Sequence, residues 1–217
     1  MILAILLAAA EPAPKNAIEA ERAFAADAQK LGQWTAFRKY ASSAAVMFVP
    51  RVVSARQWLR DKKDPPKSVR WQLAQSFQSC DGLTAINLGP WQRPDGSFGY
   101  FTTVWFYEDG LIAGPRWLWV YDAGDTLRTP MRAPAKPKIR RAACNEIQAA
   151  PNPWRYPIPS VPSPDSPEAQ EAKLHARDHT LRYDYKVDAA GNRQFSAWLW
   201  NGRVFEQILN QTVAAPK

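Results

Sequence analysis

The segment that decides the fold runs from Val69 to Asp122 and reads VRWQLAQSFQSCDGLTAINLGPWQRPDGSFGYFTTVWFYEDGLIAGPRWLWVYD. Apolar and polar residues alternate over Val69–Gln78, which is the pattern of a half-buried strand. Three Asp-Gly pairs, which begin at Asp81, Asp95 and Asp109, separate further segments rich in aromatic and β-branched residues. Because Asp-Gly favours tight turns between paired strands, the segment predicts an antiparallel meander.

The last two strands of this meander are apolar on both faces. Tyr100–Glu108 is dense in aromatic and β-branched residues, and Arg116–Asp122 follows it after a turn. Strict alternation in the second of them places Trp117, Trp119 and Tyr121 on one face, and Leu118 and Val120 on the other. We therefore expect another layer of structure on each side of the sheet.

Helical patterns precede the meander. Asn16 and Glu19 form a capping box, followed by an apolar stripe at spacings of three and four residues, which Gly32 ends: Ala17, Ala20, Phe24, Ala28 and Leu31. A second helix is expected over Gln33–Tyr40, and a third from a cap at Ser54 to Asp61. Helices followed by antiparallel strands predict an α+β fold, with a curved antiparallel sheet wrapped around the N-terminal helices.

The composition changes after this domain, which we place at residues 14–126. Residues 127–167 are basic and rich in proline, and we expect a long irregular connection there. Ser166–Arg177 has the composition of a short helix. Residues 168–217 then alternate like strands, with Asn201-Gly202 as a hairpin turn, and predict a C-terminal β-meander packed on the main sheet or extending it.

Residues 1–13 predict a signal peptide, because an apolar run ends there in small residues. The alternative is an apolar N-terminus of a cytosolic protein. Cys80 and Cys144 fit one disulfide in a periplasmic or secreted protein, or else two separate buried thiols. The formal charge of +8 favours acidic partners. The basic segment lacks interleaved aromatic residues, so we expect no specific nucleic-acid binding and at most peripheral contact with anionic envelope surfaces.

Several motifs resemble the nuclear transport factor 2-like superfamily, which includes ketosteroid isomerase and polyketide cyclase-like proteins. They are the opening helices in AIEAERAFAADAQKLGQWTAFRKY and the runs DGLTAINLGPWQRPDG, YFTTVWFYEDG and RWLWVYDAGD. The sequence is similar to a bacterial branch of unassigned activity. The resemblance implies a cone-like α+β barrel with an apolar pocket at its open end, and a homodimer formed through the sheet.

Aromatic side chains supply the candidate ligand-binding residues, although the same residues suit a plain core. The candidates are Trp34, Tyr40, Trp71, Thr103, Trp105 and Trp119. Asp122 ends an aromatic strand, where it either faces a pocket or caps the turn at Gly124. Tyr40, Tyr100 and Tyr121 are candidate hydrogen-bond donors. His175 and His179 lack a third ligand, so no metal site or other cofactor is predicted.

Three functions remain open on these observations. The first is an exported, non-catalytic domain that binds a small apolar ligand or a protein partner in an aromatic pocket. The second is an isomerase, dehydratase or cyclase with Asp122 or a tyrosine as acid–base; a buried carboxylate at the end of an aromatic cavity would favour it. The third is an envelope-associated protein held by its basic segment.

Overall fold

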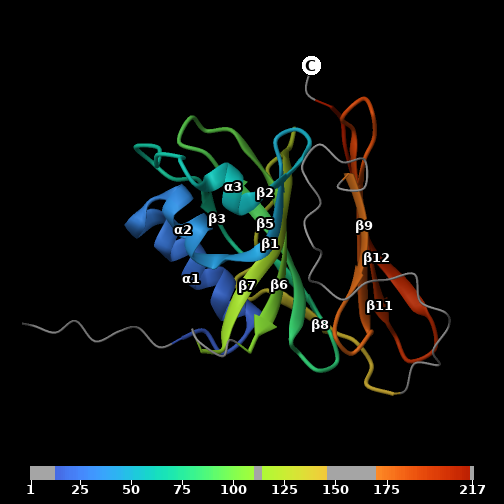
Figure 1. The fold of residues 1–217 in the computed structure, drawn as a ribbon. Coiled ribbons are helices and arrows are strands. Elements are labelled where there is room, and N and C mark those ends of the chain that lie inside the picture. The colour runs from blue at the N-terminus through green and yellow to red at the C-terminus, as the bar shows by residue number, and fades with distance from the viewer. Residues whose placement is uncertain (1–12, 110–113, 146–169, 216–217) are drawn as a thin grey trace, which may run out of the picture.

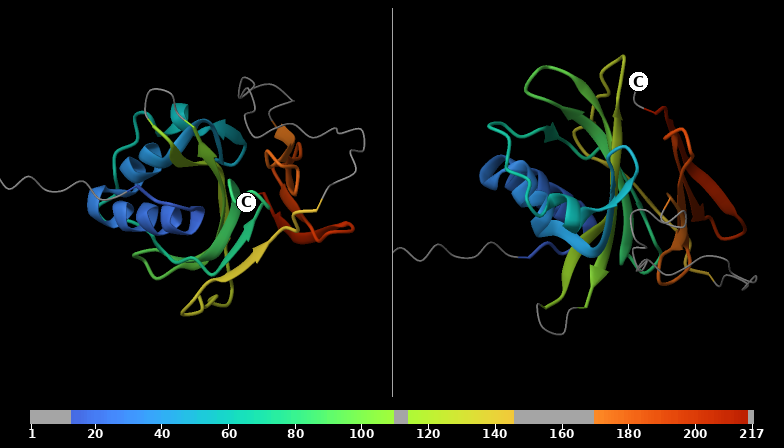
Figure 2. Two further views of the ribbon diagram at one scale, coloured as in Figure 1. Left: turned by 90° about the horizontal axis from the view of Figure 1, so that it is seen from below. Right: turned by 45° about the horizontal axis from the view of Figure 1, so that its top comes forward.

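The computed structural model describes residues 13–109, 114–145 and 170–215. Three layers follow one another in Figures 1 and 2: a group of helices, a curved main sheet, and a second sheet made by the C-terminal part of the chain. The predicted signal peptide at residues 1–13 lies almost entirely outside the described residues. Within the described part of the chain, no helix is long and apolar enough to cross a membrane.

The helical layer consists of α1 (Ala17–Leu31), α2 (Gln33–Tyr40) and α3 (Ala55–Leu59). The Asn16 side chain caps α1 as predicted, because its Oδ1 accepts hydrogen bonds from the amides of Ile18 and Glu19. Gly32 separates α1 from α2 with φ of 109°, a backbone angle that favours glycine. Ser54 directly precedes α3 as predicted, but its side chain makes no capping hydrogen bond, and α3 ends before Asp61.

The main sheet is mixed. Its strands are β1 (Ala41–Phe48), β2 (Val52–Ser54), β3 (Arg70–Trp71), β4 (Gln75–Gln78), β5 (Thr84–Gln92), β6 (Phe98–Glu108), β7 (Arg116–Thr126) and β8 (Lys138–Arg141). The strand order is β2-β1-β7-β6-β5-β4-β8, and β3 also pairs with β5. The predicted antiparallel meander is confirmed for β4 to β7, whereas β1 runs parallel to β7 and β8 runs parallel to β4.

The first predicted strand, Val69–Gln78, is interrupted. The amides of Gln72 and Ala74 donate to the carbonyls of Pro90 and Leu88. Residues 72–74 therefore lie opposite only two residues of β5, Gly89 and Pro90. The two backbones approach closely here: a Cβ at Gly89 would lie 2.0 Å from the Gln72 carbonyl oxygen. Glycine at position 89 therefore permits the irregular pairing that alternation alone does not predict.

The C-terminal sheet contains β9 (Glu171–His175), β10 (Leu181–Val187), β11 (Arg193–Trp200) and β12 (Phe205–Val213), in the order β12-β11-β10-β9. The short helix predicted over Ser166–Arg177 is wrong where the structure describes it, because β9 occupies that position. Pairing with β10 and burial of Leu174 and His175 determine its extended conformation. The predicted hairpin at Asn201-Gly202 is confirmed.

Two apolar cores lie on opposite faces of the main sheet. The helix-side core joins α1, α2 and α3 to Trp105, Trp117 and Trp119. The intersheet core joins the other face of β5, β6 and β7 to the C-terminal sheet, with Val104, Tyr121, Leu181, Tyr183 and Phe195 among its members. The prediction that both faces of β6 and β7 would be covered is confirmed.

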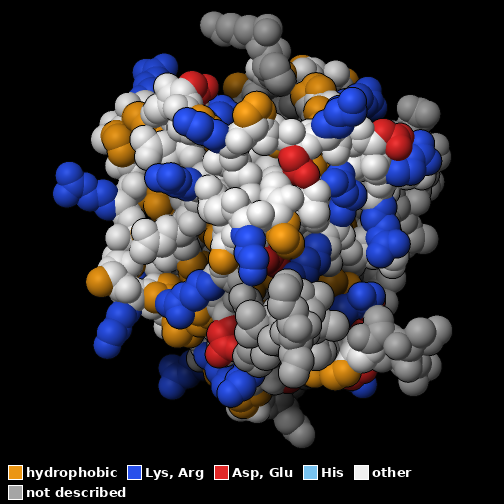
Figure 3. Space-filling view, turned by 90° about the vertical axis from the view of Figure 1, so that its left-hand side faces the viewer, with side chains coloured by type: hydrophobic (Ala, Val, Ile, Leu, Met, Phe, Trp, Pro, Cys, Tyr) orange, Lys and Arg blue, Asp and Glu red, His pale blue; other side chains and the backbone are white. Residues whose placement is uncertain are grey.

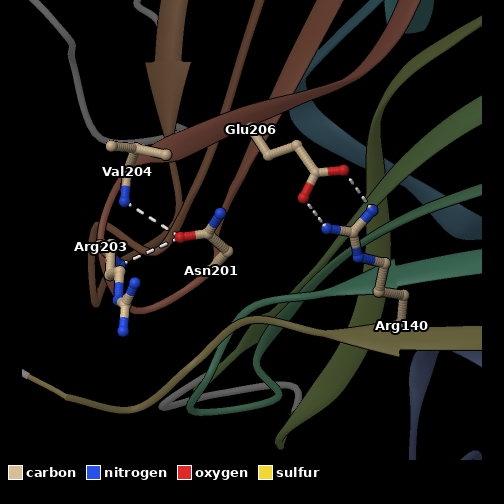
Figure 4. Close-up of polar contacts among 5 residues, drawn as sticks. All are labelled: Arg140, Asn201, Arg203, Val204 and Glu206. Atoms are coloured by element: carbon tan, nitrogen blue, oxygen red, sulfur yellow. Dashed lines mark hydrogen bonds and ion pairs between the residues drawn. The ribbon is translucent and has the colours of Figure 1, made fainter.

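Polar contacts also hold the C-terminal sheet in place. Arg140 on β8 and Glu206 on β12 point toward each other and form a bidentate ion pair, as Figure 4 shows. The Asn201 side chain stabilises the neighbouring turn by accepting from the amides of Arg203 and Val204. Part of the segment predicted to be irregular, Lys138–Arg141, is thus an edge strand that connects the two sheets.

The predicted disulfide is confirmed, since Cys80 and Cys144 are bonded. It attaches the chain that follows β8 to the end of β4, next to the parallel pairing of these strands. Such a bridge is typical of oxidising compartments, so the structure is compatible with an extracellular or periplasmic protein.

Candidate functional site

A cavity of about 280 Å³ lies between α1 and α2 and the helix-facing side of β6 and β7. We call it the aromatic pocket. Six aromatic side chains line it: Phe24, Trp34, Phe37, Trp71, Trp91 and Phe101. Its polar lining includes Thr103, Asp122 and Asp125, together with Arg93 from the β5–β6 turn. A concave, mostly apolar space with a few polar groups is the usual form of a small-molecule site.

The aromatic walls are fixed by contacts among themselves. The Phe24 ring lies 4.8 Å, centroid to centroid, from both Phe37 and Trp71, in edge-to-face geometry. Trp34 lies between Phe37 and Trp58, at 5.4 Å and 5.3 Å. Edge-to-face pairs at such distances stabilise one arrangement of the rings. The pocket is therefore largely formed before any ligand enters.

A β-bulge in β7 determines which residues of that strand face the pocket. Val104 pairs with Tyr121 and Trp105 pairs with Trp119, so Val120 is an extra residue on β7. Val120 and Tyr121 consequently both lie in the intersheet core. The predicted common face of Trp117, Trp119 and Tyr121 is thus wrong at Tyr121. Beyond the bulge the alternation is shifted by one residue, and Asp122 shares the helix-facing side with Trp119.

Asp122 is half-buried among the aromatic residues of the pocket. It lies opposite Thr103 on β6, whose hydroxyl donates a hydrogen bond of 2.7 Å to Asp122 Oδ2. Burial raises the pKa of Asp122 to about 7; the hydrogen bond from Thr103 opposes this shift, and the charge of Glu21 adds to it. Asp122 does not cap a turn at Gly124, because β7 continues regularly to Thr126. The carboxyl group can therefore exchange a proton near neutral pH.

Glu21 of α1 is a second carboxylate, 1% exposed, in the adjoining core. It accepts hydrogen bonds from Nε1 of Trp71 at 2.8 Å and from Nε1 of Trp105 at 2.7 Å. Asn87 Nδ2 lies 3.4 Å from its Oε2. Burial raises the pKa of Glu21 to about 7, although these three hydrogen bonds lower it. Glu21 thereby connects the pocket wall, through Trp71, with the centre of the helix-side core.

The structure divides the predicted ligand-binding residues into two groups. Trp34, Trp71 and Thr103 line the aromatic pocket. Tyr40, Trp105 and Trp119 lie behind it in the helix-side core, and each is at most 7% exposed. The Tyr40 hydroxyl donates to Asp27 at 2.9 Å rather than into the pocket. Tyr121 faces the intersheet core, on the opposite side of the sheet from Asp122.

Glu21 was missed by sequence reasoning, although a signal for it exists. It occupies the apolar stripe of α1, four residues after Ala17 and three before Phe24, where an unpaired charge is unexpected. Phe24 belongs to the predicted apolar stripe of α1, and Phe37, Trp91 and Phe101 carry no sequence pattern that distinguishes a pocket residue from a core residue. Their position in the pocket depends on the tertiary packing of α1 and α2 on the sheet.

The charge of the chain is not gathered at the pocket. Figure 3 shows Lys and Arg side chains spread over the face that carries the helices, with a few acidic side chains among them.

The two histidines do not form a metal site with other residues that the structure describes. His175 and His179 stack at 4.2 Å between ring centroids, and Asp178 accepts hydrogen bonds from Thr180 and from the Asp81 amide. Among the described residues, no group of three or more His, Cys, Asp or Glu side chains could hold a metal ion.

Comparison of this chain with models of known protein families, with curated proteins and with solved structures gives no match.

Proposed function

We propose that the protein binds a small, mostly apolar ligand in the aromatic pocket and works outside the cytoplasm. The observation that carries the proposal is the preformed cavity, with six aromatic side chains and the half-buried carboxylate of Asp122. Apolar walls supply affinity, and a small number of polar groups orients the ligand. The disulfide between Cys80 and Cys144 supports the extracytoplasmic location.

The proposal also concerns the fold of the helices and the main sheet. The main sheet curves around the helices, and the pocket opens between the helices and the sheet, which is the arrangement that the resemblance to the nuclear transport factor 2-like superfamily implies. We infer that this part of the chain is a cone-like barrel of that type. The C-terminal sheet covers the face of the sheet used by the expected homodimer, so a dimer would need another surface.

Filling the pocket tests ligand binding. Val69 is half-buried at the pocket, and Val69→Trp places an indole into the cavity. With phenethyl alcohol as the probe, we expect a dissociation constant in the millimolar range or below for the native chain, and a loss of about tenfold in the variant. Tryptophan fluorescence and calorimetry report binding. Val204→Trp is the matched control, because Val204 is 59% exposed in the turn between β11 and β12, away from the pocket.

Acid–base catalysis is a second candidate function, favoured by one observation. Asp122 combines access to the cavity with a pKa of about 7, which suits a group that takes and returns protons at neutral pH. An isomerase, dehydratase or cyclase would use it in this way. The assay is hydrogen–deuterium exchange of phenylacetone in heavy water, followed by NMR. Acceleration that is lost in Asp122→Asn supports catalysis, and exchange at the buffer rate contradicts it.

A further inference from the structure

We propose that the preferred ligand of the aromatic pocket is an organic cation, with an apolar body and one ammonium group that the Asp122 carboxylate binds. This inference rests on the proposed binding function and adds the chemical class of the ligand. It starts from the charges around Asp122. Glu21 faces it from α1, Asp125 follows it on β7, and Arg93 lines the pocket from the β5–β6 turn.

Asp122 and Glu21 have no ion-pair partner in the described part of the chain. Among the described residues, neither Asp122 nor Glu21 takes part in an ion pair; the paired acids are Asp27, Asp61, Glu108, Glu171 and Glu206. The Arg93 guanidinium is held over the Trp91 ring, at 4.4 Å from its centroid. A carboxylate in apolar surroundings without a cation is costly to keep ionised. An ammonium group from the ligand would supply the missing charge and a charge-assisted hydrogen bond.

The walls suit the same ligand. Three of the six aromatic lining residues are tryptophans, whose ring faces attract cations more strongly than those of tyrosine or phenylalanine. The apolar body of an alkylammonium or arylalkylammonium ion also buries well against Phe24, Phe37 and Phe101. An anionic ligand would instead meet Asp122, with Glu21 and Asp125 nearby. A neutral ligand would leave the ionised form of Asp122 without a compensating charge.

The sign of the pH dependence separates these ligand classes. Without ligand, Asp122 has a pKa of about 7 because of burial, so it is largely protonated below that pH. A bound cation favours the ionised carboxylate and lowers its pKa. By linkage, affinity for a cation rises as the pH increases through about 7. A neutral hydrogen-bond acceptor that binds the protonated acid would show the opposite trend.

The test uses three probes of similar size and shape: phenethylammonium, phenethyl alcohol and phenylacetate. Calorimetry on the full-length chain gives the three dissociation constants at about pH 5.5 and about pH 8, where the ammonium probe stays charged. We expect the ammonium probe to bind about tenfold more tightly than the alcohol at about pH 8. That advantage should shrink by about tenfold at the lower pH, because Asp122 is then protonated.

Asp122→Asn removes the charge and keeps the shape of the side chain. It should abolish the preference for the ammonium probe while the affinity for phenethyl alcohol is preserved, and this preserved affinity also shows that the variant is folded. The control is Glu171→Gln, which removes one negative charge from an exposed position on β9 and should keep the preference.

Each other outcome is decisive. Equal binding of alcohol and ammonium, or tighter binding of phenylacetate, overturns the cation inference but leaves ligand binding in the pocket intact. Binding of none of the three probes at millimolar concentration overturns the proposed function itself. A preference for ammonium that survives in Asp122→Asn overturns the assignment of Asp122 as the group that recognises it.

Discussion

Glu21 shows at the scale of one residue how the core and the pocket are coupled. Its carboxylate is shared between the indole of Trp71, which lines the pocket, and the indole of Trp105, which does not. A glutamate whose pKa is raised in the folded state binds a proton that the unfolded chain has already lost. Proton binding at this site is therefore linked to folding.

The free energy of unfolding should consequently fall as the pH rises. The pKa of Glu21 is about 7 in the folded state, against 4.5 for an unperturbed glutamate, so the folded state binds more protons between these limits. The loss over this window is about 3 kcal/mol from Glu21. Urea unfolding at several pH values between about 5 and 8 measures it.

Glu21→Gln should remove the share of this slope that Glu21 contributes, because glutamine does not titrate. The pH dependence of stability that remains in the variant reports on Asp122, because burial raises the pKa of Asp122 as well. Glu171→Gln, an exposed change on β9, serves as the control and should leave the slope as it is. A native chain whose stability is constant or increases from about pH 5 to about pH 7 would contradict the assignment of buried, proton-binding carboxylates.

At the scale of elements, most helices and strands could be predicted from the sequence, but the phase of β7 could not. In Trp117–Asp122 every residue before the aspartate is apolar, so either face of the strand can be buried. Alternation then gives no signal for the extra residue at Val120. This phase decides whether Asp122 faces the pocket. It also decides whether Tyr121 can serve there as a hydrogen-bond donor.

Parallel pairing was missed for a related reason. The hairpin signals act between neighbouring segments, whereas β1 reaches β7, and β8 reaches β4, across long intervals of sequence. Lys138–Arg141 is short and basic, and three prolines shortly before it suggest an irregular segment. Its extended conformation depends on the edge of β4 and on the nearby disulfide, both of which are tertiary features.

The disulfide should stabilise this edge substantially. Cys80 and Cys144 are 64 residues apart, and closing a loop of that length in the unfolded chain corresponds to about 4 kcal/mol. We expect the double variant Cys80→Ser, Cys144→Ser to lose about that much free energy of unfolding in urea. Reduction of the native chain with dithiothreitol is the control and should give a similar loss. Equal stability of oxidised and reduced chains would contradict this role.

The whole molecule joins its two sheets through one continuous core. Intersheet side chains from β5, β6 and β7 contact those of β10 and β11, and the Thr102 hydroxyl and the Gln211 side chain hydrogen-bond across the layers at 3.0 Å. Layers that share a core of this kind unfold together in small proteins. The C-terminal sheet is thus part of the folding unit in the described residues.

Leu181→Ala tests this cooperativity, because Leu181 is fully buried between the sheets. We expect a loss of about 2–5 kcal/mol and a single unfolding transition, observed at the same urea concentration by tryptophan fluorescence and by circular dichroism. Val204→Ala, at a 59% exposed position, should change stability by less than about 0.5 kcal/mol. Two separate transitions in the native chain would show that the sheets fold independently.

The bulge at Val120 has a consequence for how such a pocket could diverge. A homologue with a single-residue deletion at this position would restore regular pairing along β7 while Tyr121 still opposes Val104 and Asp122 still opposes Thr103. The carboxylate would therefore keep its place beside the ligand. A codon inserted between Tyr121 and Asp122 would instead turn the strand beyond it by half a repeat, and could change an acidic binding site into a neutral one without any substitution in its lining.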